Sequence, residues 1–448
     1  YIYYSKDIDS NFNAFINDFS TICFKVVLYI TFMLEKGIAF NRNDFEKFLK
    51  FSGTDFFYVN DIFKNLANDN LINLNQMINN NYSGIEWCEI EPDKKYNWLT
   101  NDLQSEFEDF VSLGNKEQKS SNKQTENVIF KVYSRGVATS RDNWVYNFDT
   151  NSLTQNVESI IQTYNEHVFK WNMLTEKQNI DDFVSYDDKK ISWGESLKSF
   201  LSRGKSASFN ESNIRVSLYR PFTKSNLYFD RMLNERVYVF PAIFPNKQAE
   251  NENKVICLPG PGGRTSYWCI CANIIPNLSI ITIDANQCFP FYIYSEDGLH
   301  RQENITGWAL IHFCKHYQDA TITKWDIFYY VYGLLHNEEY RIKYATNLRR
   351  ELPRIPYAPD LETFRAYSQA GQQLAELHLN YEQHSEYPLT RIYAPDQPHN
   401  WEVQKMKLNK DKTAIIYNDW LTLSGIPKDT FEYRLGNRSA LEWVIEQY

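Results

Sequence analysis

One run of residues divides this sequence into two parts: residues 115–126 (NKEQKSSNKQTE) contain no apolar side chain. Such a run has nothing to bury, so it predicts a solvated linker between folded units. The residues before it are acidic, because 86–109 hold eight carboxylates against two lysines. We therefore predict a helical segment at 1–82, an acidic connector with a polar linker at 83–128, and a second domain at 129–448.

The composition supports folded domains with a large core. The 448 residues include 11 Trp, 31 Tyr and 30 Phe, which excludes a wholly disordered chain. Seven Cys, an odd number, are widely spaced and indicate reduced thiols in a cytoplasmic protein. The longest apolar run, 21–34, is too short for a bilayer and contains Lys25, so no membrane partner is expected. The chain does not begin with Met, and we expect it to be a piece of a longer polypeptide.

Apolar periodicity predicts helices before the linker and mixed elements after it. In the first segment, helices are expected at 12–34, 43–50 and 59–68, compatible with either a winged-helix unit or a plain helical bundle. Beyond the linker, strands are expected at 128–133, 144–148, 237–240, 254–258, 278–283 and 289–294. Helices are expected there at 155–171, 305–317, 324–334, 337–350 and 361–377. The predicted class is α+β: a mixed domain preceded by a small helical segment.

No convincing catalytic motif is present, and we predict no catalytic residue in this chain. The nearest match to a phosphate-binding loop, RGKS at 203–206, has Ser199 where the pattern requires Gly. A nuclease motif can be spelled from Pro92-Asp93 and Glu117-Gln118-Lys119, but its second half lies in the polar linker, where no packed strand would hold it. Nucleophile elbows are absent.

Metal ligation is also not expected. Cys269 and Cys271 share a strand face, and His312 and His316 share a helix face, but neither pair has the second pair that a zinc site requires. Ordinary buried cysteines and partly exposed histidines are favoured.

Two basic runs stand out in a chain of net charge -9. Residues 200–240 hold seven basic side chains against three acidic ones, and 404–438 hold seven against four. DNA affinity depends on such local patches rather than on net charge, although each run can equally be a solvated face. The glycine-rich run 260–263 can similarly be a phosphate-cradling loop, but Pro261 removes an amide donor, which favours a tight turn presenting Arg264.

Four motifs resemble the carboxy-terminal part of the type ISP restriction-modification enzymes, in matching order. They are YSRGVATSRDNWVYN at 133–147, SLYRPFTKSNLYFD at 217–230, KWDIFYYVYGLLH at 324–336 and YRLGNRSALEWV at 433–444. The resemblance extends from about Gly84 to the end, and residues 1–82 match poorly.

This resemblance implies a DNA target recognition domain. Family members join a nuclease, a translocase, an adenine-N6 methyltransferase and this domain in one polypeptide. The methyltransferase motif Asn-Pro-Pro-Tyr is absent here, so the resemblance implies duplex DNA as partner, no cofactor in this chain, and S-adenosylmethionine bound by an upstream methyltransferase domain. The alternative is an interaction module that couples methyltransferase and translocase without contacting bases.

The matched motifs supply the candidate DNA contacts. The first motif offers donors for phosphates or base edges, with Gly136 permitting a tight bend. Its candidates are Arg135, Thr139, Ser140 and Arg141. The alternative is that its two arginines pair with Asp142 and nearby carboxylates.

The second and fourth motifs complete the set, together with the turn at Arg264. Their candidates are Arg220, Lys224, Arg434, Asn437 and Arg438. Arg220 can instead form a buried ion pair, and Asn437 can instead cap a helix. The third motif, with Trp325, Tyr330 and Gly333, is interpreted as core packing.

Overall fold

The computed structural model describes residues 3–5, 87–89, 103–115, 127–281, 283–295, 297–403 and 405–447. The chain divides into two compact units, 1–103 and 104–448. In the first unit, β1 (Tyr3–Ser5) pairs antiparallel with β2 (Trp87–Glu89). The helices predicted within 1–82, the winged-helix alternative and most of the polar linker lie outside the described residues.

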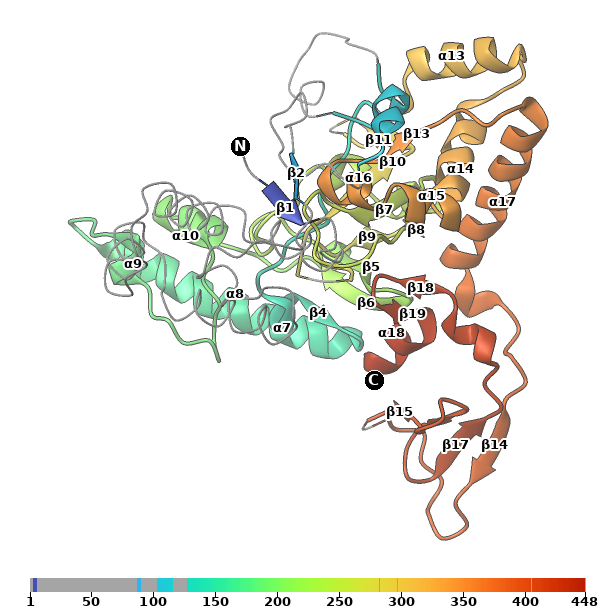
Figure 1. The fold of residues 1–448 in the computed structure, drawn as a ribbon. Coiled ribbons are helices and arrows are strands. Elements are labelled where there is room, and N and C mark those ends of the chain that lie inside the picture. The colour runs from blue at the N-terminus through green and yellow to red at the C-terminus, as the bar shows by residue number, and fades with distance from the viewer. Residues whose placement is uncertain are drawn as a thin grey trace, which may run out of the picture. The chain divides into compact units, whose positions relative to one another are not determined.

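The second unit contains two largely buried sheets (Figure 1). One is mixed, with the order β4-β6-β5-β9 and a single parallel pair, β5 with β9. The other is antiparallel, with the order β10-β7-β8. The strands are β4 (Tyr146–Asn147), β5 (Ile214–Arg220), β6 (Thr223–Tyr228), β7 (Val255–Pro259), β8 (Ile270–Ala272), β9 (Ile275–Pro276) and β10 (Asn286–Pro290). Together with the surrounding helices they confirm the predicted α+β class.

A pair of helices, α14 (Lys324–Leu334) and α17 (Leu361–Leu379), packs beside the three-stranded sheet. A Cβ atom on Gly333 would lie 2.5 Å from the backbone oxygen of Tyr367, and one on Gly371 would lie 2.0 Å from that of Tyr329. Only glycine permits this close crossing. Trp325 stacks on Phe291 at 3.5 Å, so the third motif is core packing, as predicted.

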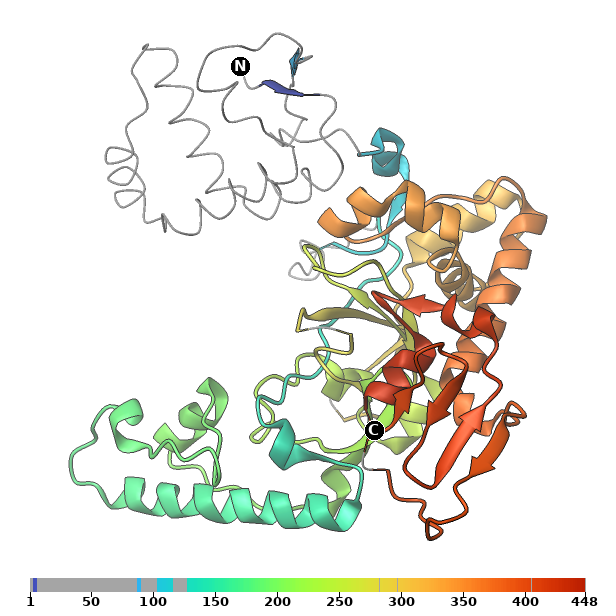
Figure 2. The ribbon, with the colours of Figure 1, turned by 60° about the horizontal axis from the view of Figure 1, so that its bottom comes forward.

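A second core lies under the four-stranded sheet and α8 (Thr150–Met173). The buried side chains of α8 recur every three or four residues, which is the pattern of an amphipathic helix. They are Leu153, Val157, Ile160, Ile161, Tyr164, Val168 and Trp171. With α9 (Ile180–Phe183) and α10 (Glu195–Ser202), this helix forms a segment, 150–202, that we call the arm (Figure 2).

The carboxy-terminal residues form a small antiparallel sheet, a hairpin and a helix. The sheet order is β14-β17-β16-β15. The elements are β14 (Thr390–Tyr393), β15 (Lys407–Leu408), β16 (Ala414–Ile416), β17 (Leu421–Ser424), β18 (Arg434–Leu435), β19 (Arg438–Ser439) and α18 (Ala440–Glu446). The β18–β19 hairpin and α18 carry the fourth motif.

Shorter elements connect these parts. The helices are α7 (Asp142–Val145), α11 (Phe240–Ile243), α12 (Lys247–Glu252), α13 (Gly307–Tyr317), α15 (Glu338–Lys343) and α16 (Ala345–Arg350). The strands are β3 (Val111–Ser112), β11 (Tyr292–Tyr294), β12 (Arg301–Glu303) and β13 (Arg354–Ile355), and the 3-10 helices are η1 (Ser105–Asp109), η2 (Glu211–Asn213), η3 (Tyr381–Gln383) and η4 (Lys428–Phe431). No helix among the described residues is both long and apolar enough to cross a membrane.

The end of the predicted acidic connector packs into the second unit. β3 pairs antiparallel with β13, and Phe107 and Leu113 are fully buried. Residues 104–115 therefore join the larger domain, although they precede the polar run. The predicted separation of the two domains at that run stays a prediction.

The predicted helices correspond to α8, α13, α14, α15 with α16, and α17, whereas several strands differ. Residue 240 begins helix α11 rather than ending a strand, and the described residues of 278–283 form no strand. The β5–β6 hairpin was not predicted, because Arg215 is buried while Val216 is 39% exposed. Arg215 pairs with Glu250, and this reverses the usual alternation of apolar and polar side chains.

Candidate nucleic-acid interface

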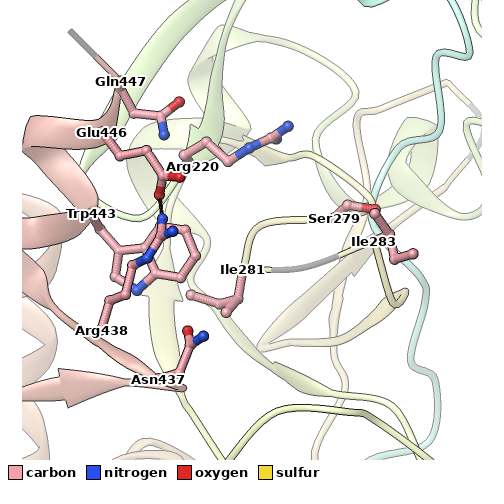
Figure 3. Close-up of a pocket in the computed structure, with 9 residues that line it drawn as sticks. All are labelled: Arg220, Ser279, Ile281, Ile283, Asn437, Arg438, Trp443, Glu446 and Gln447. Carbon is pink, nitrogen blue, oxygen red and sulfur yellow. Dashed lines mark ion pairs between the residues drawn. The ribbon is translucent and has the colours of Figure 1, made fainter.

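A pocket of about 370 Å³ brings together three of the predicted site residues, Arg220, Asn437 and Arg438 (Figure 3). Arg220 ends β5, whereas Asn437 and Arg438 belong to the β18–β19 hairpin. The remaining lining residues come from the described part of the loop 277–284, from α18 and from the residue that follows α18. They are Ser279, Ile281, Ile283, Trp443, Glu446 and Gln447.

The hairpin is shaped by its turn. Gly436 has φ +66°, in the left-handed region that favours glycine, and Arg434 donates a hydrogen bond to the carbonyl of Asn437. Ser439, not Asn437, caps α18, in a capping box with Glu442. The capping alternative for Asn437 is therefore excluded, and its side chain is exposed at the pocket.

Arg438 lies against α18. Its guanidinium lies 5.0 Å from the centre of the Trp443 ring and forms an ion pair with Glu446 (Figure 3). The Trp443 indole in turn donates to the Leu435 carbonyl at 2.9 Å. These contacts fix the direction of the arginine while its side chain stays 39% exposed.

Arg220 is held by its neighbour and not by a carboxylate. Its guanidinium donates to the Tyr219 carbonyl at 2.7 Å and lies 4.1 Å from the Tyr219 ring centre. Among the described residues it has no ion pair, so the alternative of a buried ion pair does not hold for Arg220. Arg220 therefore brings to the pocket a positive charge that forms no ion pair with any described residue.

The loop 277–284 joins the pocket to two other predicted elements. Leu278 donates its amide hydrogen to the Val137 carbonyl at 2.8 Å, which places the first motif beside the loop. Asp284 accepts three hydrogen bonds from the Arg264 side chain, at 3.1, 3.3 and 2.7 Å. Arg264 is therefore presented by a tight turn, as favoured, and its side chain remains 62% exposed.

The first motif differs from its prediction, because Arg141 is fully buried. Its guanidinium donates to three backbone carbonyls, and it pairs with Glu235 at 3.2 Å. The carbonyls are those of Thr139, Leu233 and Ser192. Burial lowers the pKa of Arg141, and Glu235 partly offsets this effect. Arg141 therefore leaves the set of DNA-contact candidates, because no donor faces solvent; its carboxylate partner is Glu235, not Asp142.

The other residues of this motif are divided between core and surface. Thr139 is buried and donates its hydroxyl to Asp142, so it too faces inward. Ser140, with φ +53°, and Arg135 are exposed. Gly136 serves a close approach rather than a bend, since a Cβ there would lie 2.3 Å from the backbone oxygen of Asn277.

Lys224 lies at the start of β6 and contacts the residues that follow α17. Its ammonium is 2.7 Å from a Glu382 carboxylate oxygen and 4.9 Å from the Tyr381 ring centre. Lys224 does not line the pocket, and 26% of its side chain is exposed.

The candidate metal ligands have other roles. Burial raises the pKa of the Cys271 thiol to about 12 and also raises the pKa of the Cys269 thiol well above its usual value. His316 stacks on Tyr357 at 4.1 Å, and His312 bonds the Trp308 carbonyl. Within the described ranges, no cluster of three or more His, Cys, Asp or Glu residues could hold a metal ion.

Sequence reasoning missed the apolar side of the pocket. Ile283 is 79% exposed, yet the run 278–283 suggested a buried strand because it is rich in isoleucine. Two flanking polar residues, Asn277 and Asp284, were the available signal that this segment is a loop, since such residues favour turns.

The sequence model of the type ISP C-terminal specificity domain matches residues 128–448. Comparison with curated protein sequences gives no significant match. Three solved structures of DNA complexes are similar in fold to this chain.

The cryo-EM structure of a DrdV–DNA complex is 34% identical, with TM-score 0.71 over 84% of this chain and 37% of that chain. A nuclease-deletion mutant of the type ISP restriction-modification enzyme LlaGI, with a DNA substrate mimic, is 32% identical, with TM-score 0.68 over 83% and 33%. The ATP-dependent type ISP enzyme LlaBIII bound to DNA is 27% identical, with TM-score 0.69 over 84% and 23%.

The chain thus spans at most 37% of the length of these relatives. The sequence model covers most of the chain, from the first residues after the polar run to the last. The resemblance drawn from the four motifs is confirmed, and the protein belongs to the family of type ISP C-terminal specificity domains.

Proposed function

We propose that this chain recognises a specific sequence of duplex DNA through the pocket formed by Arg220, Asn437 and Arg438. The observation that carries this proposal is the convergence of these residues from two distant segments on one exposed pocket. The similar structures, which are DNA complexes, support it.

The pocket side chains suit base-edge recognition. Asn can form two hydrogen bonds with adenine in the major groove, and Arg can do so with guanine. The exposed Ile283 side chain offers an apolar surface of the kind that contacts a thymine methyl group. Arg264, Arg434 and Lys224 lie outside the pocket lining and are suited to phosphate contacts that fix orientation.

Catalysis belongs, in this proposal, to another part of a longer protein. We assign adenine-N6 methyl transfer, with bound S-adenosylmethionine, to an upstream methyltransferase domain, on the basis of the family resemblance. The purified chain should then transfer no methyl group from S-adenosylmethionine to DNA, and a measurable transfer would contradict this assignment.

The binding test uses the 448-residue chain and fluorescence anisotropy. Duplexes enriched from a randomised library should bind more tightly than the starting pool, and affinity should fall steeply between about 50 and 200 mM salt. Asn437→Ala should weaken binding to the enriched duplex by about 1–3 kcal/mol, whereas Asn151→Ala, an exposed α8 position outside the pocket, should not.

Two results would contradict the proposal. The first is the absence of any enriched duplex, which would favour a module that couples other domains without contacting bases. The second is equal binding by the Asn437 and Asn151 variants, which would place recognition outside this pocket.

A further inference from the structure

One buried imidazole, that of His378, contacts the segments that support both sides of the pocket. His378 lies in the last turn of α17 and is 7% exposed. Its ring contacts the segment before the β18–β19 hairpin on one side and the β5–β6 turn on the other. It does not itself line the pocket.

The contact with the hairpin is a hydrogen bond. His378 Nε2 lies 3.0 Å from the hydroxyl of Tyr433, and the two ring centroids are 5.5 Å apart. Tyr433 immediately precedes Arg434, the first residue of β18, so this bond fixes the position at which the hairpin leaves the core.

The contact with the β5–β6 turn is aromatic. The Phe222 ring packs edge-on against His378, with centroids 5.5 Å apart, and against Tyr381 at 5.4 Å. Phe222 has φ +53°, a conformation that bulky residues adopt only where their surroundings hold them. The same turn directly follows Arg220, the last residue of β5. Its position therefore determines where the Arg220 backbone lies.

The imidazole itself is fixed by the helix pair. His378 Nδ1 is hydrogen-bonded to the hydroxyl of Tyr332, which is fully buried on α14. The glycine-mediated crossing of α14 and α17 keeps these two residues in register. A neutral imidazole has one donor and one acceptor nitrogen, and two tyrosine hydroxyls can satisfy both.

We propose that His378 is a positioning residue that sets the separation between Arg220 and the Asn437–Arg438 hairpin, and thereby the DNA sequence preference. This inference rests on the proposed function of the pocket. It predicts that loss of the imidazole impairs discrimination between duplexes more than it impairs general DNA affinity.

The test compares three variants of the full chain in binding to the enriched duplex and to the randomised pool. His378→Phe keeps a ring but removes both hydrogen bonds, and should reduce the ratio of the two affinities by about tenfold. His378→Gln places a polar group near the Nε2 position and should restore most of the ratio. His378→Asn reaches only the Nδ1 position and should not.

A double-mutant cycle separates positioning from general destabilisation. His378→Phe combined with Asn437→Ala should lose less discrimination than the sum of the two single changes, because displacing the hairpin already removes part of what Asn437 contributes. The matched control is Tyr330→Phe, which removes another buried hydrogen bond of α14, to the Pro356 carbonyl at 2.7 Å. It should leave discrimination unchanged.

The outcomes are distinguishable. If the wild-type chain enriches no duplex, the proposed function fails. Suppose instead that the wild-type chain enriches a duplex and that Asn437→Ala weakens binding to it. If His378→Phe then keeps the wild-type ratio of affinities for the enriched duplex and the randomised pool, only the positioning role of His378 is overturned. Additive losses in the cycle, or equal rescue by Gln and Asn, would also overturn it.

Discussion

The first and fourth motifs both present arginines beside small polar residues, yet the structure uses them in opposite ways. Arg141 is fully buried and bonds three carbonyls and one carboxylate. Arg438 lies at the pocket rim with its side chain 39% exposed. The same residue type thus fastens the fold in one region and remains available to a ligand in the other.

The difference lies in what surrounds each arginine. The acceptors of Arg141 include the Ser192 carbonyl, in the loop that precedes α10, and the Leu233 carbonyl, which lies beyond β6. The arm is therefore attached to the body through this side chain. The Arg438 guanidinium contacts Trp443 and Glu446 of α18, which follows it directly, and 39% of its side chain remains exposed.

The largest expected effect is on stability, from Arg141→Ala. Removing one member of a buried ion pair leaves Glu235 and several carbonyls without their donor, which should cost about 3–5 kcal/mol in the free energy of unfolding. Thermal denaturation should show a large fall in Tm. A variant with unchanged Tm and weakened DNA binding would reverse the roles assigned to these two arginines.

The next largest effect on stability is expected at acidic pH, through protonation of His378. Burial lowers the pKa of this imidazole from 6.5 to about 4, with a further lowering by Arg341. The folded state therefore favours the neutral imidazole. The contribution of His378 to the free energy of unfolding is fully present above pH 6.5 and is lost as the pH falls toward 4. The loss from this group should reach about 3 kcal/mol.

Urea unfolding at neutral and acidic pH measures this effect. The His378→Gln variant lacks the titrating group and should show a shallower acid dependence than the wild type. If the free energy of unfolding of the two proteins depends equally on pH, the fold does not hold the His378 imidazole neutral.

Arg438→Ala should have a smaller effect than Arg141→Ala, and it should weaken DNA binding rather than stability. DNA binding should weaken by about 1–3 kcal/mol, while stability should change by about 0.5 kcal/mol or less, because exposed ion pairs contribute little. Anisotropy and thermal denaturation of the same preparation give both values. A large fall in Tm without a change in binding would make Arg438 a structural residue like Arg141.

The smallest effect is expected from cutting the polar run at 115–126. Trypsin can cleave at Lys116, Lys119 and Lys123, and such solvated runs are preferred sites. Residues 104–115 should stay bound after cleavage, since β3 pairs with β13 and Phe107 is buried. Native mass spectrometry should detect the fragments together with little change in Tm; first cuts within 200–240 or 404–438 would contradict the predicted linker.

The sequence by itself determined the main helices after the linker and the family. Helices α13, α14 and α17 directly follow Thr306, Thr323 and Asp360, whose side chains cap the first turn of each helix. Capping and apolar periodicity depend on residues three or four positions apart, so they are visible in a single sequence. The four motifs likewise identified the family without the fold.

Only the tertiary structure decided which polar side chains face solvent. Arg215 is buried because Glu250 lies opposite it, and Arg141 because distant carbonyls surround it. Arg220 and Asn437 share a pocket because His378, on a third segment, contacts both of their supports. Each outcome depends on a partner many residues away, and the balance between burial and solvation of a charge is set by that partner rather than by the local sequence.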